Sequence, residues 1–166
     1  EQWGELAAAP AQKQPYILCY FISDPGEVGQ RAQELHERTG WPIVQLAGIR
    51  RALPGAETVV FDAGPREFLG LFRNAACVCT NSFHGSVFSM QFDRPFFTAM
   101  SPKEKAEPAY SRIYSLLSRL GCADRIMGMP DTVAVDESMD YAAIHQKLAE
   151  ARAESAEYLR RAIEGK

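Results

Sequence analysis

The run Asn81-Ser82-Phe83-His84-Gly85-Ser86 combines side chains that could bind an anion with one that could move a proton. Serine hydroxyls and the asparagine amide can donate hydrogen bonds to phosphate or carboxylate oxygens. His84 is one of only three histidines in the chain, and an imidazole can act as a general acid or base near neutral pH. Gly85 would let a ligand approach the backbone closely. The run therefore predicts an anion site with acid–base chemistry.

The same residues also have a structural interpretation. Serine and asparagine before a helix are ordinary N-caps, and a single histidine is commonly a hydrogen-bonded structural residue. The position of the run favours function, because the apolar segment 76–80 is typical of a buried strand and leads directly into it. In open parallel sheets, ligands bind at the carboxyl ends of strands, near the N-terminus of the next helix.

Strand-length apolar segments alternate with helical patterns along the chain. We expect strands over 16–22, 42–47, 58–61, 76–80 and 94–100, and helices over 25–40, 65–74, 83–92, 113–120 and 140–164. A connection is expected around Arg50-Arg51 and Pro54-Gly55, between the second and third strands. This alternation predicts an α/β fold with an open, doubly wound, mostly parallel Rossmann-like sheet and a long C-terminal helix.

Composition limits the class of protein. The chain has 166 residues, 46% of them hydrophobic, enough for one core. Its 18 basic and 21 acidic residues nearly cancel, and no basic cluster follows a helix face, which argues against nucleic acid as a partner. The longest apolar run, 16–22, is too short to cross a bilayer. We expect one domain over residues 14–166, preceded by a linker over 1–13 that lacks a folding pattern.

Four cysteines are present: Cys19, Cys77, Cys79 and Cys122. The first three lie inside apolar runs, where a small thiol packs well, and we interpret them as structural. Cys77 and Cys79 share one face of a strand, but zinc sites favour a Cys-x-x-Cys turn with a second ligand pair, so no metal is expected. A domain of this size needs no disulfide, which fits a reducing cytoplasm.

A longer pattern resembles a known family. The segments that carry the resemblance are 64–69, 74–75, 80–89 and 94–96, followed by Ser111-Arg112-Ile113. Their order and spacing resemble the C-terminal region of polysaccharide pyruvyl transferases, over about residues 61–125. The resemblance implies two Rossmann-type domains facing across a cleft, as in GT-B glycosyltransferases. This chain would be the second, donor-binding domain. An N-terminal domain of the same polypeptide would be its partner and would carry most of the acceptor site.

The resemblance also implies a reaction. A pyruvyl group would move from phosphoenolpyruvate to a sugar of a glycan, forming a ketal without a further cofactor, and the isolated domain would be inactive. His84 is the expected acid that protonates the methylene carbon of the donor. The groups expected to hold the donor's phosphate and carboxylate are Asn81, Ser82, Phe83, Gly85, Ser86, Arg112 and Lys103. Arginine matches both anions, but Arg112 has an equal interpretation as a capping or surface charge.

Lys103 reads most simply as part of a solvated loop, Ser101 to Lys105. Some family members carry a basic residue two positions before the motif histidine, where this chain has Ser82. Asp62 follows a strand and could face the cleft or cap the next helix, and capping is the expected role.

Two other functions stay open. A glycosyltransferase-like enzyme could use a nucleotide-sugar on a similar domain, although no acidic residue stands at convincing spacing for the ribose hydroxyls. A non-catalytic domain could instead hold a partner with its cleft or with the helix over 140–164, although docking of that helix on its own domain is the simpler expectation.

Overall fold

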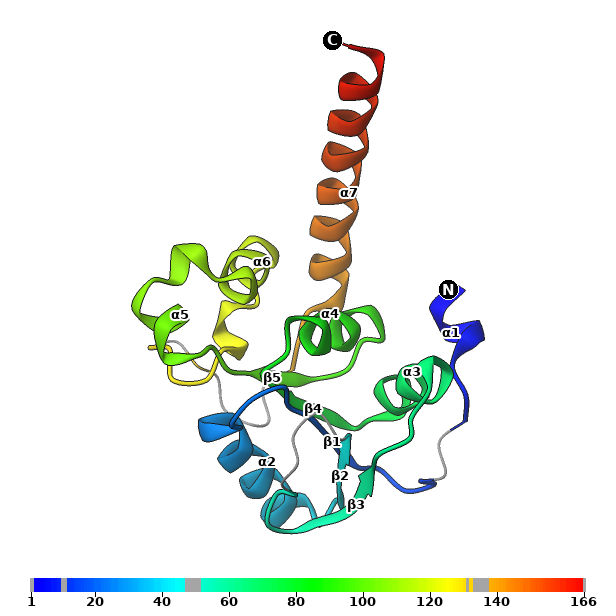
Figure 1. The fold of residues 1–166 in the computed structure, drawn as a ribbon, viewed down its shortest axis with the longest axis vertical. Coiled ribbons are helices and arrows are strands. Elements are labelled where there is room, and N and C mark those ends of the chain that lie inside the picture. Colours follow the sequence, from blue (N-terminus) through cyan, green and yellow to red (C-terminus); the bar gives the residue numbers. More distant parts are fainter. Residues whose placement is uncertain (1, 10–11, 47–51, 131, 133–137, 166) are drawn as a thin grey trace.

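The computed structural model describes residues 2–9, 12–46, 52–130, 132 and 138–165. Within them the chain forms a five-stranded, all-parallel sheet with the order β3-β2-β1-β4-β5 (Figure 1). The strands are β1 (Ile17–Tyr20), β2 (Ile43–Leu46), β3 (Ala56–Val60), β4 (Cys77–Thr80) and β5 (Phe96–Thr98). The predicted parallel α/β sheet is confirmed, and most strands are shorter than their apolar runs. The connection expected at Arg50-Arg51 lies outside the described residues.

Helices flank the sheet on both faces and extend beyond it. They are α1 (Gln2–Leu6), α2 (Gly26–Thr39), α3 (Pro65–Asn74), α4 (Phe83–Gln91), α5 (Pro102–Ala106), α6 (Arg112–Leu120) and α7 (Tyr141–Glu164). Two 3-10 turns, η1 (Pro108–Tyr110) and η2 (Ala123–Arg125), flank α6. The long C-terminal helix is confirmed.

Alternate residues of each strand enter two separate cores. Ile17 and Cys19 of β1 face α2 and form one core with Val28 and Leu35 of that helix. Leu18 faces the opposite side, where residues of α3, α4 and α6 complete the second core. Because the central strands are buried on both faces, their sequences read as continuous apolar runs rather than as alternating patterns.

The direction of the chain reverses between β1 and β4. From β1 the chain runs through α2 to β2 and then to β3, and it returns through α3 to β4 on the other side of β1. The register pairs Tyr20 with Thr80, so the two strands end at the same level. The loops that leave them lead to helices on opposite faces, which opens a crevice of the kind that binds ligands in open α/β sheets.

The stretch expected to lack structure contains α1, which packs on α3. The Ala8 N–H donates to the Arg66 carbonyl oxygen at 2.9 Å, and the Trp3 ring meets the Phe88 ring edge-on, with 6.0 Å between centroids. Gly70 of α3 allows this approach, because a Cβ there would lie 1.9 Å from the Ala8 carbonyl oxygen. The prediction of a stretch without a folding pattern is therefore wrong for Gln2–Leu6, and the domain boundary at residue 14 stays a prediction.

The long helix α7 begins on the body of the domain and then projects away from it (Figure 1). Ile144 is buried near its start, whereas Leu159 and Ile163 are 58% and 85% exposed. The expectation that the whole helix docks on its own domain is wrong for this second half. No helix of the described residues combines the length and apolarity that crossing a membrane requires.

Candidate functional site

The serines of the predicted site build the N-terminus of α4. Ser82 is the N-cap, and its Oγ accepts a hydrogen bond from the Gly85 N–H at 3.4 Å. Ser86 is fully buried, and its hydroxyl donates to the Ser82 carbonyl oxygen at 3.4 Å. These hydroxyls are engaged inside the turn. The turn can still offer a ligand the N–H groups of Phe83 and His84, which have no acceptor within their own helix.

Gly85 holds the start of α4 against the end of β4. A Cβ on Gly85 would lie 2.3 Å from Thr80 Oγ1, so only glycine allows this approach. The Thr80 hydroxyl donates to the Tyr20 carbonyl oxygen at 2.5 Å and accepts from the Ser82 N–H at 3.1 Å. The ends of β1 and β4 and the first turn of α4 therefore form one hydrogen-bonded unit.

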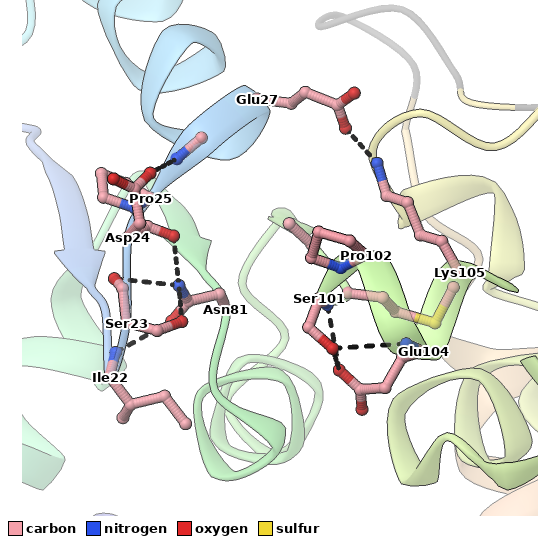
Figure 2. Close-up of a pocket in the computed structure, with 13 residues that line it drawn as sticks. Ile22, Ser23, Asp24, Pro25, Glu27, Asn81, Ser101, Pro102, Glu104 and Lys105 are labelled. Atoms are coloured by element: carbon pink, nitrogen blue, oxygen red, sulfur yellow. Dashed lines mark hydrogen bonds and ion pairs between the residues drawn. The ribbon is translucent and has the colours of Figure 1, made fainter. Parts of the chain in front are cut away.

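Asn81 connects β4 to the loop that follows β1 (Figure 2). Its Oδ1 accepts from the Ile22 N–H at 2.8 Å, and its Nδ2 donates to the carbonyl oxygens of Ser23 and Asp24 at 3.2 and 3.0 Å. Nδ2 also donates to Ser23 Oγ at 3.0 Å. The amide that the sequence assigned to ligand binding thus already fixes the loop that leads into α2.

Replacing Asn81 with alanine should lower the free energy of unfolding by about 1–3 kcal/mol, because the substitution leaves several loop groups without their partner. Asn74→Ala is a matched control, since the Asn74 side chain donates a single hydrogen bond, to the Gly70 carbonyl oxygen. Urea denaturation of both variants checks the difference. Equal losses would show that the Asn81 contacts add no stability.

Two of the predicted residues, His84 and Arg112, contact the ring of a third, Phe83. His84 is exposed, and its ring meets Phe83 edge-on with 5.7 Å between centroids. The guanidinium of Arg112 lies 5.1 Å from the Phe83 ring centroid, a cation–π contact. Arg112 is the first residue of α6, whose N-cap Ser111 accepts from the Tyr114 N–H at 3.3 Å. An imidazole, a guanidinium and the N-termini of α4 and α6 therefore meet at one place, which favours an anion.

A shallow hollow of about 420 Å³ lies beside this group. Phe83 and residues of η1 and α6 line it, among them Tyr110, Arg112 and Arg119. Of the described residues that line it, two are arginines and none carries a carboxylate. Arg119 forms an ion pair with Glu154 of α7, so the net positive charge of the lining comes from Arg112.

Lys103 lies on α5, apart from this group. The segment expected to be a solvated loop is a helix that begins with a capping box between Ser101 and Glu104. Glu104 also accepts from the Ser111 hydroxyl at 3.1 Å, so it joins α5 to the start of α6. Partial burial opposes its ionisation, but the hydrogen bonds from Ser101 and Ser111 and the charge of Arg112 outweigh this and lower the pKa of Glu104. The spacing Ser-Pro-x-Glu was the overlooked sequence signal.

A larger cleft, of about 780 Å³, opens at the carboxyl ends of β1, β4 and β5 (Figure 2). It is lined by residues 22–27 after β1, Asn81 after β4, and residues 99–102 with Glu104 and Lys105 after β5. An ion pair between Glu27 of α2 and Lys105 of α5 spans it. Among the residues that line this cleft, the sequence predicted only Asn81. The others come together because β1, β4 and β5 are neighbours in the sheet, which the sequence alone does not show.

A family model described as polysaccharide pyruvyl transferase matches residues 3–103, more than half of the chain. The chain belongs to the polysaccharide pyruvyl transferase family. This membership indicates a transferase with a glycan acceptor. Neither a search of curated proteins nor a search of solved structures found a significant match. The matched stretch contains residues 81–86, called here the His84 turn, and most of the residues that line the cleft. Arg112 and the rest of α6 lie beyond the end of the match.

The cysteines of this pyruvyl transferase domain are buried free thiols. Burial raises the pKa of Cys122 to about 11 and that of Cys19 further. Cys19, Cys77 and Cys79 all lie in the apolar core beside α2, so their structural interpretation is confirmed. Within the described parts of the chain, no three His, Cys, Asp or Glu side chains group as metal ligands would.

Proposed function

We propose that this chain is the donor-binding domain of an enzyme that moves a pyruvyl group from phosphoenolpyruvate to a sugar, forming a ketal. The family match across the His84 turn carries the proposal. The exposed imidazole, the guanidinium on Phe83 and the two helix N-termini support it, because the donor carries a phosphate and a carboxylate.

The reaction needs one acid and two sugar hydroxyls. A proton from His84 adds to the methylene carbon of phosphoenolpyruvate, and C2 becomes electrophilic enough for the first hydroxyl to add. The C2–O bond to phosphate then breaks, and phosphate leaves with the electron pair. The second hydroxyl adds to C2 and closes the ketal. Of the two protons that the hydroxyls lose, one returns to His84 and regenerates the acid, and the other leaves with phosphate.

In this proposal the phosphate of the donor lies at the first turn of α4, within reach of the N–H groups of Phe83 and His84. Arg112 neutralises the anion from the start of α6, and its contact with Phe83 limits the orientations of its side chain. A second Rossmann-type domain of the same polypeptide faces this one in a GT-B-like arrangement, and the enzyme works in the cytoplasm. The isolated domain binds the donor without turning it over.

Calorimetric titration of phosphoenolpyruvate into the full-length protein tests the proposal. We expect saturable binding that weakens about tenfold or more in Arg112→Ala, as for loss of a charge-assisted contact. Arg161→Ala, which removes an exposed arginine from the far end of α7, is the control and should bind as the wild type does. Binding of a nucleotide-sugar but not of phosphoenolpyruvate would instead support a glycosyltransferase.

A further inference from the structure

The geometry points to the cleft at the ends of β1, β4 and β5 as the site of the acceptor, bound as an uncharged, hydroxyl-rich sugar. This inference rests on the proposed function and extends it, because it assigns an acceptor site to this domain as well as a donor site. The cleft would bind the uncharged sugar, whereas the neighbouring hollow beside Phe83 and Arg112 would bind the negatively charged donor.

The size of the cleft suits a sugar. Its volume of about 780 Å³ lies within the range of about 300–1,000 Å³ that is typical of small-molecule sites. It lies where the chain direction reverses between β1 and β4, the usual place for a ligand in an open parallel sheet. The loop on the β1 side is held in place by Asn81, so this wall of the cleft is formed before any ligand arrives.

The charge of the lining disfavours the donor. Asp24, Glu27 and Glu104 contribute three carboxylates, and Lys105, which pairs with Glu27, contributes one ammonium group. Glu104, whose pKa is lowered further by the hydrogen bonds from Ser101 and Ser111 and by the charge of Arg112, is ionised at neutral pH. An excess of negative charge repels phosphoenolpyruvate, whereas carboxylate oxygens accept hydrogen bonds from sugar hydroxyls. The hollow beside Phe83 and Arg112 has the opposite charge.

The cleft also offers an apolar surface for a sugar ring. Ile22 lines it and is 58% exposed, whereas the preceding residue, Phe21, is fully buried. Pro25, in the loop after β1, and Pro102, at the start of α5, extend this surface on the two sides of the cleft (Figure 2). A sugar presents C–H groups on the faces of its ring and hydroxyls at the edge, so it can contact these apolar groups and the carboxylates together.

The two hollows share a wall, which places acceptor and donor next to each other. Glu104 lines the cleft, and its Oε1 accepts from the hydroxyl of Ser111. Ser111 is the N-cap of the helix whose first residue, Arg112, contacts Phe83. A sugar in the cleft would therefore lie beside the anion site at the start of α4.

Saturation-transfer NMR on the full-length protein tests the assignment, with methyl glycosides of glucose, galactose, mannose and N-acetylglucosamine as probes. We expect at least one glycoside to bind, and Ile22→Arg to weaken it about tenfold or more by replacing an apolar contact with a bulky charge. Phosphoenolpyruvate affinity, measured by calorimetry, should stay within about twofold of wild type. Ile163→Arg is the control, because it makes the same change on an exposed isoleucine of α7. It should change the binding of neither the glycosides nor phosphoenolpyruvate.

Each other outcome overturns a different statement. If Ile22→Arg changes phosphoenolpyruvate affinity and leaves glycoside binding intact, the cleft holds the donor. If glycosides bind equally well to wild type and Ile22→Arg, or if none binds while phosphoenolpyruvate does, the acceptor site lies elsewhere and the proposed function stands. If wild type binds neither phosphoenolpyruvate nor any glycoside, the proposed function itself fails.

Discussion

His84→Gln is expected to lower the rate of pyruvyl transfer by about 10²- to 10⁴-fold, the usual contribution of a positioned general acid. Glutamine keeps a hydrogen-bonding side chain of similar reach but cannot deliver a proton to the methylene carbon. Because His84 is exposed, the change should leave folding intact. Phosphate release under saturating donor measures the rate, and calorimetry measures donor affinity, which should fall by less than about tenfold.

His145→Gln is the matched control for this substitution. His145 is also exposed on a helix, where its Nε2 lies 2.6 Å from Asp93 Oδ1, away from the predicted site. We expect its effect on the rate to stay within about twofold, as for a surface position. A His84→Gln enzyme with the wild-type rate would mean that another group supplies the proton and that His84 only contributes to the surface of the site.

The sheet was predictable because its information is local. Each central strand is buried on both faces, so segments such as 16–22 and 76–80 are apolar throughout and bounded by turn residues. The helix over 65–74 carries its own signals, since a proline begins it and an apolar stripe follows. The position of the His84 turn after β4 followed directly from that alternation.

Contacts between distant segments were not predictable in the same way. The partners of Asn81 lie 57–59 residues earlier in the chain, and they become visible only once β1 and β4 are known to be neighbours. The N-terminal stretch is ordered by α3: Arg73 donates to the Gly4 carbonyl oxygen of α1, and Ala8 contacts the Arg66 carbonyl oxygen and the space beside Gly70. No pattern within residues 1–13 carries that information.

The residues that begin each helix were predicted less well than the existence of the helices. Asp62 was expected to cap α3, but the N-cap is Gly64, in extended conformation and without a side-chain hydrogen bond, so the prediction is wrong. An acidic residue two positions before a Gly-Pro pair was weaker evidence than the pair itself, because proline already fixes the first helical position. The charged residues Glu104 and Arg112, on which the proposed donor and acceptor sites rest, both lie in the first turns of helices.

Gly85→Ala should lower the free energy of unfolding by about 3 kcal/mol, at the upper end of what overpacking costs, and should also impair donor binding. The added Cβ would meet Oγ1, Cβ and Cγ2 of Thr80 at 2.3, 2.9 and 3.0 Å. Thr80 is fully buried and bonded to Tyr20 and Ser82, so it has little room to move. The start of α4 must therefore shift away from β4, and the N–H groups of Phe83 and His84 shift with it.

Urea denaturation of Gly85→Ala measures this cost, and Gly4→Ala is the control. Gly4 is also helical, but its Cβ would lie 3.5 Å from the nearest Arg73 atom, an ordinary contact, so alanine should be neutral or slightly stabilising there. In a Thr80→Ala background two of the three close contacts of Gly85→Ala disappear, and its cost should shrink by about 1 kcal/mol or more. Fully additive effects of the two substitutions would show that contact with Thr80 is not what requires glycine at the start of α4.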